Sequence, residues 1–252
     1  MSRDPVQRAW SERALAYFRT HAIAPEAAAA CGVVEHGGRL SYPNVRDDGT
    51  IFYRVRDLEL GRTLQPRGEP LTVWCPSGVS RRSLAALVTE GESDALAALT
   101  AIRGSRSRTL QGVAVVSVPG ASFPVARLAD HLAAAGVSSV WLAYDADTAG
   151  ERATETAKAK LAEAGIAARE LRFPAGMDLA DCLVAADQPS QRIEQVLFNA
   201  DPSADDVQHD REAELLRKAG VPQKRSTRNP EIARKHWGWR TLCACAACVY
   251  GP

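Results

Sequence analysis

The sequence lacks long apolar runs. Although 46% of its 252 residues are hydrophobic, no stretch approaches the roughly 18 consecutive uncharged apolar residues that a membrane-spanning helix needs. The first ten residues, MSRDPVQRAW, carry charges and no apolar centre, so they do not form a secretory signal. Both absences favour a cytoplasmic protein with no membrane partner. The length is sufficient for one large domain or two small ones.

Cysteine is scarce and the net charge is small. Six cysteines at irregular positions do not indicate a disulfide framework, because the cytoplasm keeps thiols reduced. We expect Cys31, Cys75 and Cys182 to be small buried apolar residues. A net charge of +1 excludes a globally basic nucleic-acid binder, but local basic strips can still bind phosphates. One such group precedes the acidic motifs: Arg54, Arg56, Arg62, Arg67, Arg81 and Arg82.

The N-terminal third predicts a small α+β subdomain over residues 1–83. Helical spacing of apolar residues predicts helices over 5–20 and 25–30. Two alternating runs, 39–45 and 50–57, flank an Asp48-Gly49 turn signal, which is typical of a hairpin. The run LTVWC predicts a further strand over 71–75. We therefore expect a mainly antiparallel sheet over residues 39–76.

The pattern changes at residue 84. Predicted strands alternate with predicted helices, which is typical of a parallel sheet flanked by helices. The strands are expected over 84–90, 113–118, 138–145 and 168–173, and the helices over 92–103, 123–135 and 148–165. We expect one α/β domain over residues 84–198. Residues 199–252 are polar, turn-rich and basic, and are expected to form a linker and a partly disordered tail.

Three acidic motifs follow the predicted strands. In parallel sheets the carboxyl ends of the strands face one crevice, so these side chains are expected to lie together. If the strand at 138–145 continues, alternation directs Asp145 and Asp147 to the same side, where both can bind one hydrated Mg²⁺. Each motif alone has a structural alternative as helix-start charge, turn or N-cap. Their occurrence together favours a metal site, and the motifs contain Glu90, Asp145, Asp147, Asp178 and Asp181.

These motifs carry a resemblance to a known family. In order, LVTEGESDALAAL, VVSVPGAS, VWLAYDADTAGERATETAKAKL and PAGMDLADCL resemble the Toprim domain of DnaG-type primases and phage primase-helicases. Upstream, AYFRTHAIAPEAAAACGVV and LSYPNVRDDGTIFYRVRD are similar to the small N-terminal subdomain of the same core. The resemblance covers about residues 10–190. It implies a Toprim (Rossmann-like) parallel sheet preceded by a small α+β subdomain.

The resemblance also implies roles for single residues. By position, Glu90 would act as general acid or base or help to hold a metal ion, and Asp145 with Asp147 would coordinate Mg²⁺, or Mn²⁺ in its place. Asp94, Asp178 and Asp181 would line the same metal site. Glu92 is expected to face solvent. The arginine group from Arg54 to Arg82 would grip a triphosphate or the template backbone, with a solvated strand face as the alternative.

The implied function is that of a primase-like nucleotidyltransferase, which makes or extends short primers from nucleoside triphosphates on single-stranded DNA. A Toprim nuclease and a non-catalytic DNA-binding replication adaptor remain alternatives. No zinc ribbon precedes Trp10 and no Gly-x-x-x-x-Gly-Lys-Ser/Thr phosphate loop occurs. A zinc-ribbon or replicative helicase partner is therefore expected, with elongation faster than initiation by the chain alone. The spacing of Cys243, Cys245 and Cys248 after His236 is tighter than in zinc ribbons, so we expect no zinc site.

Overall fold

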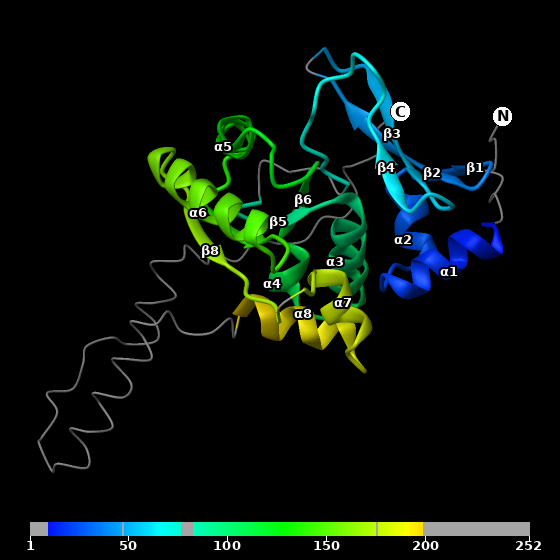
Figure 1. The fold of residues 1–252 in the computed structure, drawn as a ribbon. Helices are drawn as coiled ribbons and strands as arrows, with labels where there is room; N and C mark the ends of the chain where they lie inside the picture. The colour runs from blue at the N-terminus through cyan, green and yellow to red at the C-terminus, as the bar shows by residue number, and fades with distance from the viewer. Residues whose placement is uncertain (1–9, 47, 77–82, 175, 199–252) are drawn as a thin grey trace, which may run out of the picture. The chain divides into compact units, whose positions relative to one another are not determined.

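The structure, a computed structural model, describes residues 10–46, 48–76, 83–174 and 176–198. These residues belong to one compact unit and contain two separate four-stranded sheets, shown with their helices in Figure 1. No helix among them is long and apolar enough to cross a membrane. The N-terminal part begins with α1 (Glu12–Thr20) and α2 (Pro25–Ala30). Its sheet follows, with strands β1 (Val34–His36), β2 (Arg39–Val45), β3 (Ile51–Asp57) and β4 (Arg62–Leu64).

The first sheet is antiparallel throughout, in the order β1-β2-β3-β4. Gly49 has φ +82° in the turn between β2 and β3, a conformation that glycine adopts without steric cost. This confirms the predicted hairpin. The predicted strand over 71–75 is wrong, because only Trp74 pairs there, and it forms an antiparallel bridge to Ser117 in the second sheet.

The second sheet is parallel, as the alternation of strands and helices predicts. Its order is β6-β5-β7-β8. The strands are β5 (Ala85–Glu90), β6 (Ala114–Val118), β7 (Ser139–Ala143) and β8 (Ala167–Glu170). The helices between and after them are α3 (Glu92–Gly104), α4 (Arg108–Gln111), α5 (Val125–Ala134), α6 (Thr148–Glu163), α7 (Leu179–Val184) and α8 (Pro189–Phe198).

Buried side chains alternate between the two faces of the parallel sheet. Leu87 and Trp141 belong to the core cluster that contains α3, α7 and α8, whereas Val88 and Leu142 belong to the cluster that contains α5 and α6. Figure 1 shows the sheet between these two groups of helices. Such burial on both faces is typical of parallel sheets. The strand order places β6 and β7 on opposite sides of β5, so the chain changes direction across the sheet at the carboxyl ends of β5 and β7.

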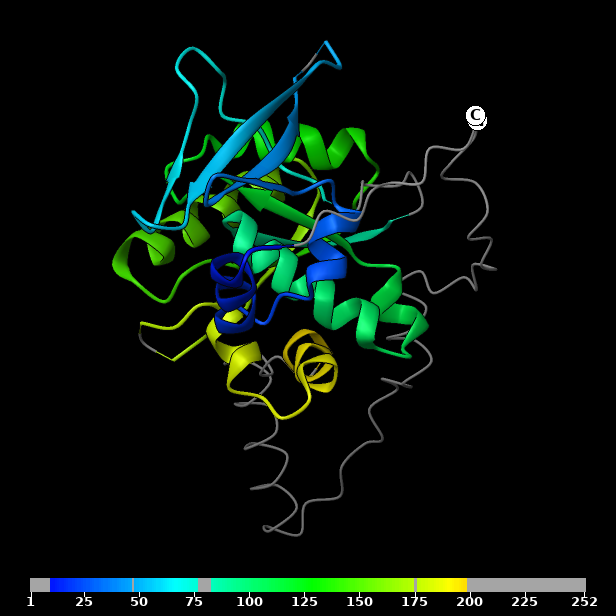
Figure 2. The same cartoon turned by 90° about the vertical axis from the view of Figure 1, so that its right-hand side faces the viewer.

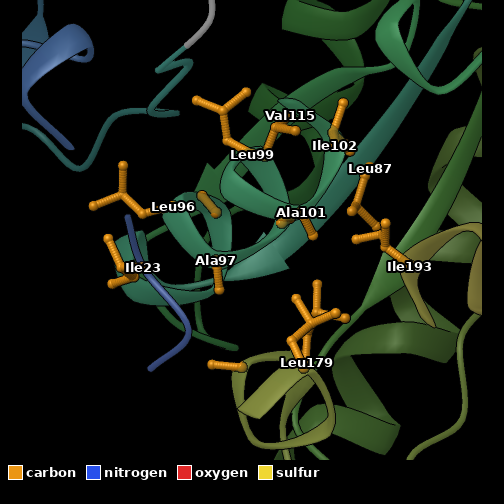
Figure 3. Packing of buried hydrophobic residues seen from close by; sticks show 14 of the residues in the cluster. Ile23, Leu87, Leu96, Ala97, Leu99, Ala101, Ile102, Val115, Leu179 and Ile193 are labelled. Carbon is orange, nitrogen blue, oxygen red and sulfur yellow. The ribbon is translucent and has the colours of Figure 1, made fainter. Parts of the chain in front are cut away.

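Helix α3 lies at the centre of the first core cluster. Figure 3 shows its apolar side chains, among them Leu96, Leu99 and Ile102, surrounded by residues of other elements. Leu87 contributes from the sheet, Ile193 from α8 and Ile23 from the segment before α2. In Figures 1 and 2, α2 and α3 lie beside each other, and the Ala24 amide donates to the Thr100 hydroxyl across them at 3.0 Å. One core therefore joins the N-terminal segment to the parallel sheet.

Candidate active site

Glu90 is the last residue of β5, at the carboxyl end of the parallel sheet. Its Oε1 accepts a hydrogen bond of 2.9 Å from the Ala121 amide, which belongs to the loop after β6. Its Oε2 is buried and has no hydrogen-bond partner among the described residues. The next residue, Gly91, has φ +125°, which lets the chain turn from the strand into α3 without a side-chain clash. Glu90 is thus held by one oxygen at the crevice where functional groups gather in such sheets.

Three carboxylates converge next to this position. Asp94 in the first turn of α3, Asp145 after β7 and Asp178 before α7 each offer an oxygen, and these oxygens lie within 4.8 Å of one another. Asp94 is only 4% exposed, and its Oδ1 accepts from the Ala180 amide at 3.0 Å. Carboxylate oxygens at this spacing form the donor set that Mg²⁺ and Mn²⁺ bind. The residues present therefore fit a divalent cation.

Asp147 lies at the start of α6 rather than in a strand. Strand β7 ends at Ala143, so the expectation of a strand continuing over residues 138–145 is wrong, and alternation does not align Asp145 with Asp147. The side chain of Asp147 is the N-cap, accepting from the amides of Ala149 at 2.8 Å and Gly150 at 2.7 Å. It is exposed and close enough to Glu90 for the two charges to interact.

The loop that carries Asp145 fits tightly against the start of α6. A Cβ atom on Gly150 would lie 2.1 Å from the Asp145 carbonyl oxygen, which is far inside van der Waals contact. The Ala146 amide donates to the Met177 carbonyl at 3.3 Å, and the Gly176 amide donates back to the Ala146 carbonyl at 3.2 Å. The loops before Asp178 and after β7 are therefore fixed to each other.

Asp178 and Asp181 form a reciprocal cap at the start of α7. Asp178 accepts from the Asp181 amide at 2.7 Å, and the Asp181 carboxylate accepts from the Asp178 amide at 3.4 Å. Asp178 is half-buried and Asp181 is exposed. Capping uses one oxygen of each carboxylate and leaves the second outside the cap. Of the two residues, only Asp178 belongs to the group of three converging carboxylates.

Burial and mutual repulsion disfavour ionisation of these acids. Burial raises the pKa of Asp145 to about 6, and the charge of Glu90 adds to the rise. Burial also raises the pKa of Asp94 well above its usual range, and Asp178 contributes further. The pKa of Glu90 is raised, again chiefly by burial. A bound cation would relieve this repulsion, because opposite charge favours the ionised form.

A cavity of about 200 Å³ adjoins Glu90 on the side of the first sheet. Its lining includes Arg54 and Arg56 of β3, Tyr17 of α1, and Gly120 after β6. The Arg56 guanidinium lies 5.7 Å from the centre of the Tyr17 ring. Cationic and hydroxyl groups thus face a carboxylate across one small space.

The predicted basic residues differ in their surroundings. Arg54 is 8% exposed and forms a buried ion pair with Glu92, whereas Arg56 is half-buried on the cavity wall. Arg62 and Arg67 are exposed. Arg81 and Arg82 lie outside the described residues, as do His236, Cys243, Cys245 and Cys248.

The expectation that Glu92 faces solvent is wrong. Its side chain is buried, with 4% exposure, and is paired with Arg54. The sequence around Glu92 resembles an ordinary charged helix start, because the arginine that neutralises Glu92 is 38 positions earlier in the chain. The alternation of β3 could have predicted the inward position of Arg54. Phe52 is buried on β3, and Arg54, two residues later, lies on the same face.

Comparison with known families covers the centre of the chain. The model of a family described as Toprim-like matches residues 87–183. The segment is a Toprim-like domain. The matched range contains the three converging carboxylates, Asp94, Asp145 and Asp178, and it also contains Glu90. No curated protein sequence matches the chain.

Solved primase structures share the fold of the Toprim-like domain and its N-terminal neighbour. The primase fragment of the bacteriophage T7 primase-helicase has a TM-score of 0.54 and 20% identity, covering 71% of this chain and 72% of that one. A structure of the bacteriophage T7 lagging-strand DNA polymerase interacting with the primase domains of two gp4 subunits gives 0.54 and 20%, with 72% and 90% covered. The zinc-binding and RNA polymerase domains of the Aquifex aeolicus primase give 0.54 and 14%, with 92% and 68% covered.

These likenesses confirm the fold predicted from the sequence, a Toprim primase core. At 14–20% identity, these structures show that the fold is shared.

Proposed function

We propose that the protein is a primase-like nucleotidyltransferase that makes or extends short primers on single-stranded DNA from nucleoside triphosphates. The observation that carries the proposal is the convergence of Asp94, Asp145 and Asp178 within 4.8 Å, beside Glu90 and a cavity lined by arginines. Primase neighbours of the fold support the substrate class, since one is described with a bound RNA/DNA hybrid and dTTP.

Asp94, Asp145 and Asp178 would hold a divalent cation, Mg²⁺ or Mn²⁺, with Asp147 and Asp181 at its edge. Such a cation supplies neutralisation of phosphate charge in nucleotidyl transfer. The raised pKa values of Asp94 and Asp145 indicate that their ionised forms are poorly stabilised in the protein alone. A bound cation would stabilise these ionised forms. Of the remaining acids, Glu90 has the free buried oxygen.

Glu90 would receive the proton of the attacking primer hydroxyl. Its Oε1 is held by the Ala121 amide and its Oε2 is unpartnered, which keeps one oxygen in place for proton transfer. A pKa raised by burial strengthens Glu90 as a base. Across the cavity, Arg56 would bind the triphosphate, while the exposed Arg62 and Arg67 would contact the template backbone, with Arg81 and Arg82 proposed from the sequence alone.

Primer synthesis takes place where the template lies, so we propose the cytoplasm as the compartment. A replicative helicase or zinc-ribbon chain is the proposed protein partner, because one structural neighbour is the primase fragment of a primase-helicase.

The test is an assay with labelled nucleotides, single-stranded DNA and a short annealed primer, with Mg²⁺, Mn²⁺ or EDTA. We expect primer extension that requires a cation and is reduced at least about 100-fold by Glu90→Gln. Asp130→Asn is the matched control, because Asp130 is an exposed carboxylate on α5. Its activity should equal that of the wild type.

The same reactions separate the alternatives. Cation-dependent shortening of the labelled DNA without extension would assign a nuclease, in which water replaces the primer hydroxyl. Cation-independent DNA binding with neither synthesis nor degradation would assign an adaptor. Either result would contradict the proposed transferase.

A further inference from the structure

The first turn of α3 has no capping side chain, although it carries Asp94 and directly follows Glu90. Gly91 occupies the N-cap position and offers no side chain to the free amide groups, which a serine, threonine or aspartate would satisfy in most helices. The position of this turn must therefore be fixed by contacts with other parts of the molecule.

Three consecutive residues of the turn are held by three different elements. Glu92 pairs with Arg54 of β3. The Ser93 side chain lies close to Tyr17 of α1 on the cavity wall, and Asp94 accepts from the Ala180 amide of α7. The turn thus connects the first sheet, the N-terminal helix and the third acidic loop.

The contact between Arg54 and Glu92 is the strongest of these in charge and burial. The two residues are 8% and 4% exposed, and Arg54 Nη1 donates to Glu92 Oε1. Burying two charges costs free energy that a close pair regains only when its geometry is maintained. With its guanidinium paired and shielded from solvent, Arg54 is poorly placed to bind phosphate.

We propose that Arg54 is a positioning residue, which holds the first turn of α3 through Glu92 and so keeps Asp94 where cation binding requires it. The inference rests on the cation site of the proposed function. It separates Arg54, which forms the close ion pair with Glu92, from Arg56, which lines the same cavity and lies over the Tyr17 ring.

Electrostatics and positioning make opposite predictions for Arg54. Its positive charge repels a cation at the neighbouring carboxylates, so removing the charge alone would tighten cation binding. If Arg54 positions the turn, removing it weakens cation binding, since residues that orient metal ligands commonly change affinity by about 10–100-fold. The sign of the change decides between the two effects.

The experiment is a titration with Mn²⁺, followed by its electron paramagnetic resonance signal, on the whole chain. We expect Arg54→Met to weaken the Kd by about tenfold or more, and Arg54→Lys, which can still pair with Glu92, to stay within about threefold. Arg56→Met removes the same charge two residues along β3 and should not weaken the Kd. Equal or tighter binding by Arg54→Met would overturn the proposal.

A second variant covers the case in which Arg54→Met does not fold, as judged by circular dichroism. Arg54→Met combined with Glu92→Leu removes both buried charges and leaves apolar side chains of similar size, an exchange that folded proteins tolerate. Net charge is then unchanged, so electrostatics predicts an unaltered Kd, whereas loss of positioning predicts a Kd weaker by about tenfold. An unaltered Kd in this variant would also overturn the proposal.

Hydrogen exchange of the Ala180 amide gives a readout that needs no cation. This amide donates to Asp94, so displacement of the turn should speed its exchange by about tenfold or more in the variant that lacks Arg54 and only slightly in Arg56→Met. If the wild type fails to bind Mn²⁺, the cation site of the proposed function is wrong, while this exchange still tests the positioning role. Unchanged exchange without Arg54 would exclude that role.

Discussion

Replacing Asp145 with asparagine tests the repulsion within the carboxylate group. Burial and neighbouring acids raise the pKa of Asp145 from 3.8 to about 6. Without a cation the folded protein therefore binds a proton more tightly than the unfolded chain, and the free energy of unfolding falls as the pH rises from about 4 to about 6. Above about pH 6 the wild type has lost all of this stability. The neutral asparagine of Asp145→Asn should not lose it, because it does not ionise.

The expected gain is moderate. A pKa rise of this size corresponds to about 3 kcal/mol, and solvent screening at the half-buried Asp145 side chain reduces the value to roughly 1–2 kcal/mol. For a protein of this length the melting temperature of Asp145→Asn should then rise by about 2–8 °C at pH 7.5 in EDTA. At pH 4 the two proteins should melt at nearly the same temperature.

The measurement is thermal unfolding at both pH values, with EDTA and with Mg²⁺. A cation that binds only the folded state stabilises it, so Mg²⁺ should raise the melting temperature of the wild type and raise that of Asp145→Asn much less. The exposed Asp130→Asn serves as the control and should behave as the wild type. Destabilisation of Asp145→Asn in EDTA, or equal stabilisation of both proteins by Mg²⁺, would refute the reasoning.

Three further predictions concern the same region. Mn²⁺ affinity should fall by about tenfold per pH unit below about 6, because Asp145 must lose its proton to bind a cation; affinity independent of pH in a titration from pH 5 to 8 would exclude Asp145 as a ligand. Gly150→Ala should lower the free energy of unfolding by about 1–3 kcal/mol and weaken Mn²⁺ binding, because its Cβ would lie 2.1 Å from the Asp145 carbonyl oxygen. Denaturant unfolding measures the first effect. An unfolding midpoint equal to that of the wild type would contradict it. Arg56→Met should weaken binding of a fluorescent nucleoside triphosphate by about tenfold, because the cavity wall loses a guanidinium that can bind a phosphate. Nucleotide titration checks this, and an unchanged Kd would remove Arg56 from the site.

The elements of the parallel sheet could be predicted because local pattern and tertiary environment agree there. The run at 113–118 is apolar except for Ser117, and β6 is buried throughout. The short strands β1 and β4 escaped prediction, since three residues give too little alternation to detect. Residues 71–75 have a strand-like composition, but only Trp74 finds a backbone partner.

The position of the site along the chain could also be predicted, but not the way in which its residues are held. Strand ends and the family resemblance indicated Glu90 and Asp145 as members of one crevice. The N-cap alternative given for these motifs applies to Asp147, which caps α6 through amides two and three positions on. Nothing local indicates that Glu92 turns inward, because its arginine is 38 positions earlier in the chain. The boundaries proposed at residues 83 and 198 stay predictions, as does each assignment of a residue to cation, nucleotide or template.

The shared core around α3 limits how this protein can be divided. Phe18, Leu40 and Tyr42 from the N-terminal segment belong to the same buried cluster as Leu96 and Leu99 of the Toprim-like domain. A fragment trimmed to the matched range of 87–183 would expose that face of α3 to water and leave Glu92 without its arginine. Expression of the Toprim-like domain alone should yield aggregated material, whereas a fragment that begins before Trp10 keeps the covering. In evolutionary terms, the N-terminal segment and the Toprim-like domain would be inherited and exchanged as one piece.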